Sequence, residues 1–229
     1  MIFDYFDAAY FINLDKRTDR RDKFEQQCRE INLPVERFSA ICPDPEQYKG
    51  RIHNTPNAHF LLGCTMSHQA VIRLAKERNQ NCVLIFEDDA IFCSNFMDKL
   101  QIISSELKTI TNWDLCYLGC SPEPDFHKAN PSGMSCEKVT ENIYFNPGAA
   151  RGTASIIIHS QFYDKILDLD PCWTYPADLM FIHYPPIKRR YLMAKELLVI
   201  QDDTSVSDLW GTPIAREQIY KDHYAKYII

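Results

Sequence analysis

Three consecutive carboxylates follow an apolar run near the middle of the chain. The stretch LIFEDDAIF places Glu87, Asp88 and Asp89 directly after residues 84–86 and before a second apolar run at residues 90–92. Adjacent carboxylates repel one another, so the folded chain must bring them a neutralising partner. A hard divalent cation such as Mg²⁺ or Mn²⁺ fits, because it accepts one or two carboxylates and keeps its other positions for water and phosphate oxygens. A solvated acidic turn that caps the next element fits equally well.

The geometry of an extended chain predicts where these side chains point. Successive side chains of a strand alternate, which puts Glu87 and Asp89 on one side and Asp88 on the other. The apolar run at residues 82–86 is typical of a central strand whose two faces are covered by helices. In open sheets of this kind, ligands bind at the carboxyl ends of the strands. Polar residues also follow the first and last predicted strands: Asn13, Asp15, Asp202 and Asp203.

Hydrophobic patterning predicts alternating strands and helices. Apolar runs predict strands at residues 8–14, 34–41, 82–86, 115–119, 153–158 and 196–200. Helical spacing predicts helices at residues 19–31, 64–79, 94–110 and 161–167, and a short helix after residue 176. Thr18 and Ser160 are the expected N-caps of the first and fourth helices. This alternation favours an α/β fold with a mostly parallel sheet and helices on both faces.

Length and composition indicate a single domain. With 229 residues, 45% of them hydrophobic, the chain can bury one core. We expect that core at about residues 8–210, followed by a helical tail at residues 213–229. The tail carries a tyrosine stripe that would pack on the body or on a second subunit of a homodimer: Tyr220, Tyr224 and Tyr227. Two long loops, 42–62 and 121–142, interrupt the pattern, and loops of this length are usually functional or mobile.

Charge and cysteine usage exclude several classes of function. A net charge of -6 argues against nucleic-acid binding. Asp4 and Asp7 in an N-terminus without a cationic lead-in argue against a secretory signal, and no apolar run reaches the roughly 18 residues of a membrane helix. Nine cysteines without a C-x-x-C pair indicate reduced thiols and a cytoplasmic protein. The set nearest to a zinc site has a spacing that matches no common pattern: Cys116, Cys120, His127 and Cys136.

Seven segments of the chain resemble glycosyltransferase family 25, which includes lipopolysaccharide-biosynthesis sugar transferases and procollagen galactosyltransferases. In order, they are YFINLDKRTDRR, LGCTMSHQAVIRLA, LIFEDDA, WDLCYLG, GTASIIIHSQFYDKIL, YPADLMF and QDDTSVSDLW. The resemblance extends from about residue 9 to residue 210, and its strength lies in the order of the blocks. It implies a GT-A type fold, a UDP-sugar donor (often UDP-galactose), a divalent metal ion and inversion at the anomeric carbon.

The matching positions imply roles for individual residues. In the acidic motif, the resemblance places Asp89 and Glu87 on the metal ion, with Glu87 and Asp88 toward the nucleotide. The first block implies a nucleotide-side group: Asn13, Arg17 and Arg21. The last block, residues 202–205 with Ser205, resembles the far edge of the donor site.

Two departures from the family pattern concern the acceptor. The loops at 42–62 and 121–142 do not match closely, and an acceptor would be chosen there. FNPGAARGTAS replaces the more aromatic run of the collagen-modifying members, which argues against collagen. We therefore expect a UDP-hexose donor and a glycan or glycoprotein acceptor.

An inverting transfer needs a base near the acceptor hydroxyl and positive charge near the departing phosphates. Asp178, in YPAD, is the preferred base because a helix start after a proline turn holds it rigidly. Asp203 is the second choice, and helix capping is the other interpretation of Asp178. Besides the metal ion, Arg17 or Arg21 could supply the positive charge.

The remaining candidates also have structural interpretations. His68 could bind a phosphate, or it could be a hydrogen-bonded histidine on the buried face of its helix. His183, five residues after Asp178, could complete the metal sphere. The arginines at the first helix could pair with their own acidic neighbours in a solvated helix start: Arg17, Arg20 and Arg21 beside Asp15, Asp19 and Asp22.

The sequence thus predicts a metal-dependent, inverting UDP-hexose transferase. One alternative is a metal-dependent nucleotide phosphohydrolase that uses the same acidic cluster and needs no acceptor. Another is a sugar-nucleotide binding module that keeps the scaffold and lacks the base.

Overall fold

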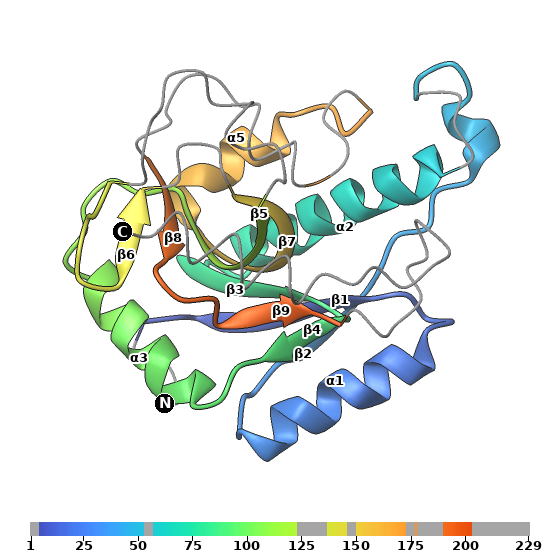
Figure 1. Cartoon of the computed structure of the whole chain (residues 1–229). Helices are drawn as coiled ribbons and strands as arrows, with labels where there is room; N and C mark the ends of the chain where they lie inside the picture. Colours follow the sequence, from blue (N-terminus) through green and yellow to red (C-terminus); the bar gives the residue numbers. More distant parts are fainter. Residues whose placement is uncertain are drawn as a thin grey trace.

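The structure is a computed structural model that describes residues 5–52, 57–122, 137–145, 150–172, 177 and 190–202. Figure 1 shows its helices and strands. The strands are β1 Ala8–Asn13, β2 Glu36–Ser39, β3 Cys82–Glu87, β4 Ala90–Phe92, β5 Leu115–Pro122, β6 Ile143–Phe145, β7 Ala150–His159, β8 Tyr191–Ala194 and β9 Val199–Gln201. The helices are α1 Thr18–Glu30, α2 Ala58–Glu77, α3 Phe96–Leu107 and α5 Tyr163–Leu167, with short 3₁₀ turns η1 Pro45–Tyr48 and η2 Ser160–Phe162. None of the helices in these ranges combines the length and apolarity needed to cross a bilayer.

A seven-stranded mixed sheet forms the centre of the described chain, in the order β2-β1-β3-β7-β5-β8-β6. The pairs β1–β2, β1–β3 and β5–β8 are parallel. The strands β7 and β6 run against their neighbours, so five of the seven strands share one direction. A second small sheet pairs β4 with β9 in antiparallel fashion. The α/β class and the mostly parallel sheet predicted from the sequence are confirmed.

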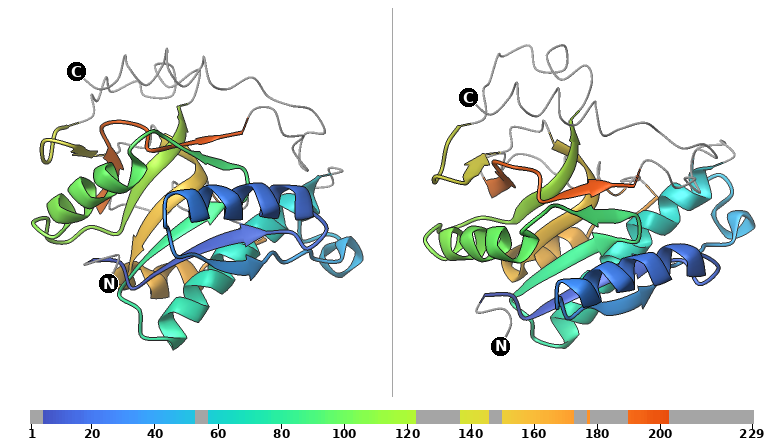
Figure 2. Two further views of the ribbon diagram at one scale, coloured as in Figure 1. Left: turned by 90° about the horizontal axis from the view of Figure 1, so that it is seen from below. Right: turned by 60° about the horizontal axis from the view of Figure 1, so that its bottom comes forward.

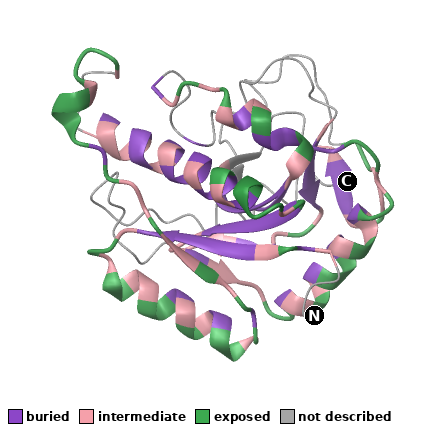
Figure 3. Cartoon of the chain, turned by 180° about the vertical axis from the view of Figure 1, so that it is seen from behind, coloured by how far each residue is buried: buried purple, intermediate pink, exposed green. Residues whose placement is uncertain are grey.

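Helices cover both faces of the sheet, and each face has its own hydrophobic cluster (Figures 1 and 2). The cluster under α1 and α3 includes Phe24 and Phe96. The cluster under α2, η2 and α5 includes Ile72, Phe162 and Ile166. Figure 3 shows the buried stripe that runs along the inner side of α2.

The central strands are apolar throughout because both of their faces are buried. In β1, Ala9 and Phe11 belong to the cluster under α1, whereas Tyr10 and Ile12 belong to the cluster under α2. In β3, the same alternation separates Leu84 and Phe86 from Val83 and Ile85. A strand covered on two sides has no position for a solvated polar side chain until it ends. The first acidic residue after this run is therefore also the first that can reach the edge of the sheet.

The helix starts differ from the sequence prediction. Thr18 is the first residue of α1, and Arg17 occupies the N-cap position without a side-chain cap hydrogen bond. Ser160 lies inside η2, and the ring Nδ1 of His159 accepts the capping hydrogen bond from the Gln161 backbone N–H. The helix α2 begins at Ala58, so the predicted loop at 42–62 is shorter and contains η1.

Three short strands were not predicted. The strands β4 and β6 have three residues each, and β8 has four. Runs this short carry too few alternations to be separated from loop residues by pattern. The strand β4 matters for the site. It begins directly after Asp89, so Asp88 and Asp89 form the connection between β3 and β4.

Gly119 allows β9 to lie directly against β5. A Cβ atom at Gly119 would lie 2.4 Å from the carbonyl oxygen of Val199, which is closer than real Cβ contacts. The backbone N–H of Leu198 donates to the Leu118 carbonyl at 2.9 Å, which fixes the same approach. This close packing determines where the end of β9, with Gln201 and Asp202, falls relative to β3.

Candidate functional site

The acidic residues lie at the carboxyl edge of the sheet, where β3 ends. Glu87 is the last residue of β3, and Asp88 and Asp89 form the turn into β4. Both aspartates reach the same guanidinium of Arg20, so the predicted separation of Asp88 from Asp89 is wrong. The alternation of an extended strand stops at Glu87 because the chain turns there.

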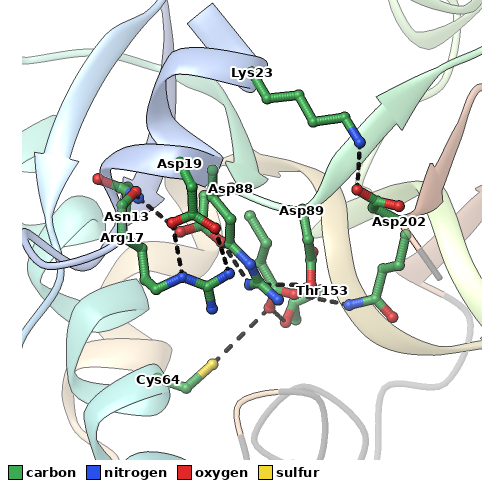
Figure 4. A network of polar contacts seen from close by, with 12 residues as sticks. Asn13, Arg17, Asp19, Lys23, Cys64, Asp88, Asp89, Thr153 and Asp202 are labelled. Carbon is green, nitrogen blue, oxygen red and sulfur yellow. Dashed lines mark hydrogen bonds and ion pairs between the residues drawn. The ribbon is translucent and has the colours of Figure 1, made fainter. Parts of the chain in front are cut away.

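Arg20 is the positive partner of this turn. Its Nη1 atom lies 2.9 Å from Asp88 Oδ1 and 3.4 Å from Asp89 Oδ2. The three side chains are only 11%, 11% and 16% exposed, so water screens their charges weakly. A positive partner for both aspartates is thus supplied by α1. Figure 4 shows Asp88 and Asp89 within the network of polar contacts at this edge of the sheet.

Glu87 makes a different set of contacts. Thr153 Oγ1, from β7, donates to Glu87 Oε1, and Gln201 Nε2, from β9, donates to Oε2 at 3.1 Å. The thiol of Cys64, from α2, approaches Oε1 at 3.9 Å. These donors are neutral, so Glu87 links β7, β9 and α2 to the end of β3 through hydrogen bonds.

Asn13 links the end of β1 to the acidic turn. Its Nδ2 atom donates to Asp88 Oδ2 at 2.7 Å and to the Arg17 carbonyl at 3.0 Å. Its Oδ1 atom accepts from Arg37 Nε at 2.9 Å. The side chain is buried, and both of its N–H groups are engaged within the protein. Asn13 therefore orients Asp88, and its amide N–H groups face protein acceptors.

Arg37 extends this network to the solvent. Its Nη2 atom lies 2.5 Å from Asp15 Oδ1, which also accepts from Ser39 Oγ at 2.8 Å. The hydrogen bond from Arg37 is the main cause that lowers the pKa of Asp15. Asp15 itself is exposed, so the carboxylate after β1 stays charged and faces water.

Three side chains on one face of helix α1 contact the acidic turn or the residues joined to it. After Arg20, Lys23 Nζ lies 2.5 Å from Asp202 Oδ2, and the Asp202 backbone N–H donates to the Asp89 carbonyl at 2.7 Å. Gln27 Nε2 donates to the Ala90 carbonyl at 3.1 Å. The positions 20, 23 and 27 share one face of the helix, which therefore lies along the whole β3–β4 connection.

The predicted nucleotide-side arginines make local contacts in the structure. Arg17 pairs with Asp19 through Nε at 3.0 Å and Nη2 at 2.9 Å, and this lowers the pKa of Asp19 to about 2. Arg21 Nε lies 3.3 Å from Asp22 Oδ1. Arg17 and Arg21 therefore pair with acidic neighbours in their own segment, which is the structural interpretation of these arginines. Arg20 instead contacts the acidic turn.

His68 lies in the interior, on the packed face of α2. Its Nδ1 atom is 3.0 Å from the Cys64 carbonyl oxygen. A carbonyl oxygen only accepts, so Nδ1 carries the proton of this hydrogen bond. These contacts match the core interpretation of His68; its phosphate-binding role stays a prediction.

Several predicted site residues lie outside the described part of the chain: Asp178, His183, Asp203 and Ser205. Within the described part, no group of three His, Cys, Asp or Glu side chains could hold a metal ion. The described cysteines are free thiols: Cys28, Cys42, Cys64, Cys82, Cys93, Cys116 and Cys172.

The sequence prediction missed four residues that build this site: Lys23, Arg37, Thr153 and Gln201. It named Arg20 among the arginines of the first helix without assigning it to the acidic turn. For Arg20 a signal existed, because it stands four and eight residues before the buried Phe24 and Cys28 on the inward stripe of α1. For Thr153 and Gln201 no local signal existed, because they are 66 and 114 residues away from Glu87 in sequence.

Comparison with known proteins identifies the class to which this α/β fold with its acidic edge belongs. The family model described as Glycosyltransferase family 25 (LPS biosynthesis protein) matches residues 6–181. The chain therefore belongs to glycosyltransferase family 25. The observed sheet, with helices on both faces, agrees with the GT-A type fold that the resemblance implied.

Curated relatives match part of the chain. Procollagen galactosyltransferase 1-A of Xenopus laevis is 30% identical over 132 residues, which are 50% of this chain and 21% of that protein. A putative glycosyltransferase of Haemophilus influenzae is 32% identical over 101 residues, 41% of this chain and 36% of that protein. The matched segments thus span about a fifth to about a third of these relatives.

Solved structures give looser matches. A glycosyltransferase involved in the glycosylation of the major capsid of PBCV-1 has a TM-score of 0.48 at 13% identity, over 86% of this chain and 94% of that one. Mouse xyloside xylosyltransferase 1 has a TM-score of 0.41 at 11% identity, over 96% of this chain and 79% of that one. At these TM-scores the overlays are too loose to transfer any residue role.

Proposed function

We propose that this chain is a glycosyltransferase that moves a hexose, galactose or glucose, from a UDP-sugar to a hydroxyl of a glycan or glycoprotein. Membership of family 25 supports sugar transfer, and the name of the Xenopus relative supports galactose. The observation that carries the proposal is the position of the acidic turn. It follows β3 at the edge where the carboxyl ends of β1 and β3 run parallel, and open α/β sheets bind ligands there.

The proposed reaction is a single displacement with inversion. The acceptor oxygen bonds to the anomeric carbon while the bond from that carbon to the diphosphate breaks, and the acceptor proton passes to a base. We assign the base to Asp178, with Asp203 as the second candidate. Positive charge near the departing phosphates stabilises the transition state, and Arg20 lies nearest to the acidic turn among the arginines of α1. Arg17 and Arg21 would add charge at the same end of the helix.

A divalent cation is part of the proposal. Carboxylate oxygens suit Mn²⁺ or Mg²⁺, which would neutralise diphosphate charge when bound. Asp89, with Glu87, would hold it. A cation there would have to displace present contacts, because Thr153 and Gln201 donate to the two Glu87 oxygens and the Arg20 guanidinium lies 3.4 Å from Asp89 Oδ2. That oxygen becomes a cation ligand only when Arg20 releases it.

The test is a turnover assay with UDP-galactose and UDP-glucose, with Mn²⁺ and with a chelator. We expect Asp178→Asn to lose at least about 100-fold in turnover with retained UDP binding, since a positioned base contributes about this much or more. Asp89→Ala should lose turnover and its response to Mn²⁺ together. Asp168→Asn, an exposed aspartate after α5, is the matched control.

The same assay separates the alternatives. Phosphate release from nucleotides without an acceptor would indicate a phosphohydrolase. UDP-sugar binding with no turnover in any condition would indicate a binding module. Full activity of Asp178→Asn would remove that residue as the base and direct the same experiment to Asp203.

A further inference from the structure

We propose that Arg37 is a positioning residue of the donor site, and that it holds Asp88 in place through the buried amide of Asn13. This inference rests on the proposed function for the place of the donor, at the edge of the sheet where β1 and β3 end. Arg37 belongs to β2, the strand at one end of the seven-stranded sheet. In this proposal Arg37 does not touch the donor; it orients side chains at the place where the donor binds.

The first support is that Arg37 supplies the donor for the oxygen end of the Asn13 amide. Arg37 Nε donates to Asn13 Oδ1 at 2.9 Å, and Arg37 Nη2 donates to the Asn13 backbone carbonyl at 3.3 Å. Asn13 is only 1% exposed, so bulk water does not replace a missing donor at this oxygen. A buried acceptor that loses its donor costs more free energy than a typical hydrogen bond contributes. Without Arg37, the amide is therefore driven to turn its oxygen toward another donor.

The second support is that the nitrogen end of the same amide holds Asp88. Asn13 Nδ2 donates to Asp88 Oδ2 at 2.7 Å and to the Arg17 carbonyl at 3.0 Å. The oxygen and the nitrogen of an amide belong to one planar group, so they turn together. An amide that turns its oxygen away from Arg37 therefore also moves its N–H groups away from Asp88. Asp88 in turn pairs with Arg20, so the change reaches the guanidinium beside the acidic turn.

The third support is that the ion pair of Arg37 lies in solvent. Arg37 Nη2 lies 2.5 Å from Asp15 Oδ1, but the Asp15 side chain is 75% exposed. Water screens an ion pair this exposed, so it contributes little to stability. A hydrogen bond from a charged donor to a buried acceptor contributes more. The main effect of removing Arg37 is therefore expected at Asn13, the buried end of its contacts.

The experiment compares two variants that differ in one hydrogen-bond donor. In Arg37→Gln, an amide nitrogen can stand where Arg37 Nε stood and donate to Asn13, whereas in Arg37→Met a methyl group takes that place. Both variants lose the charge and the contact with Asp15. By calorimetric titration of the full chain with UDP, we expect Arg37→Met to bind at least about tenfold more weakly than the wild type, and Arg37→Gln less than about threefold more weakly. Arg29→Met is the matched control, because it removes the same charge from the exposed last turn of α1.

A double variant tests whether the effect passes through Asn13. In an Asn13→Ala background the amide is absent, so Arg37→Met should weaken UDP binding by less than about twofold more. A full additional loss would mean that Arg37 contacts the donor directly, which overturns the proposal. Equal losses in Arg37→Gln and Arg37→Met also overturn it, because the charge and not the hydrogen bond would then matter. A lower Tm of Arg37→Met with unchanged UDP affinity would show a purely structural role and overturn it as well.

The NMR signals of the Asn13 side-chain amide give a second measurement. If Arg37→Met does not accumulate as folded protein, Arg37→Gln decides: its Asn13 signals and UDP affinity should stay close to those of the wild type, and binding about tenfold weaker overturns the proposal. If the wild type itself does not bind UDP, the proposed function fails, and the signals test the inference separately. They should shift in Arg37→Met and stay in place in Arg37→Gln; signals that move in neither variant overturn it.

Discussion

Asn13 shows, at the scale of single residues, that a sequence can identify a site position without identifying the partners of its side chain. Its place after the first strand marked it as a site residue. The structure turns its amide toward Asp88 and Arg37, because a carboxylate only accepts and a guanidinium only donates. A single sequence gives the donor and acceptor types, but the partners come from strands that are distant in the chain.

Replacement of Asn13 by aspartate tests this orientation. The change is isosteric, but it places a carboxylate 2.7 Å from that of Asp88, where a hydrogen bond now lies. We expect Asn13→Asp to lower the free energy of unfolding by about 2 kcal/mol at pH 7.5. Urea unfolding measures the loss.

The control for this change is Gln101→Glu, at an exposed position of α3. It adds the same charge at a position where water can screen it. An equal loss in both variants would contradict the orientation of the Asn13 amide.

The pairing of Arg17 with Asp19 gives a second prediction for single residues. The bidentate contact lowers the pKa of Asp19 to about 2 from an ordinary value of 3.8. A depressed folded-state pKa stabilises the protein above the unfolded-state value, and this stabilisation is lost as the pH falls from about 4 to about 2. NMR titration should show the Asp19 pKa return toward 3.8 in Arg17→Gln. An unchanged value would mean that Arg17 faces another partner, such as a phosphate site.

At the scale of elements, the site depends on how closely β9 packs on β5. Long apolar runs made β1, β3 and β5 predictable, because a strand buried on both faces has a continuous signal. The strand β9 is short, and its position is set by the missing side chain at Gly119. Nothing in the local pattern shows that this glycine is a packing contact, since that depends on which strand lies opposite.

Gly119→Ala tests the importance of this approach. Its Cβ atom would meet the Val199 carbonyl oxygen at 2.4 Å, and a backbone atom can yield only if β9 moves. We expect a loss of about 2 kcal/mol in the free energy of unfolding, together with weaker UDP-sugar binding as Gln201 moves away from Glu87. Denaturant unfolding and nucleotide titration measure the two effects.

Gly50→Ala is the control for this variant. Gly50 has a positive φ of 78° and open space around its Cβ position. Its replacement should cost about 1 kcal/mol of backbone strain and leave UDP-sugar binding unchanged. If Gly119→Ala behaves like Gly50→Ala, the close contact with β9 does not position the site.

At the scale of the whole molecule, the sequence predicts the layers better than the order of the strands. Alternation and apolar runs were enough for an α/β fold with helices on both faces. They were not enough to place β7 between β3 and β5 in antiparallel fashion. That insertion is a long-range pairing, and local propensity carries no information about it. The acidic turn was predictable because it directly follows the continuous apolar run of β3. Its positive partner, Arg20, was not predictable, because the contact depends on how α1 packs against the sheet.

The two neutral hydrogen bonds to Glu87 have a consequence for biosynthesis. One oxygen is held by a residue 66 positions later in the chain, and the other by a residue 114 positions later. While the polypeptide leaves the ribosome, the N-terminal half therefore emerges with Glu87 lacking both of these hydrogen bonds. A nascent chain that ends before residue 201 lacks the second donor, so both Glu87 oxygens gain their hydrogen bonds only after β7 and β9 have been made.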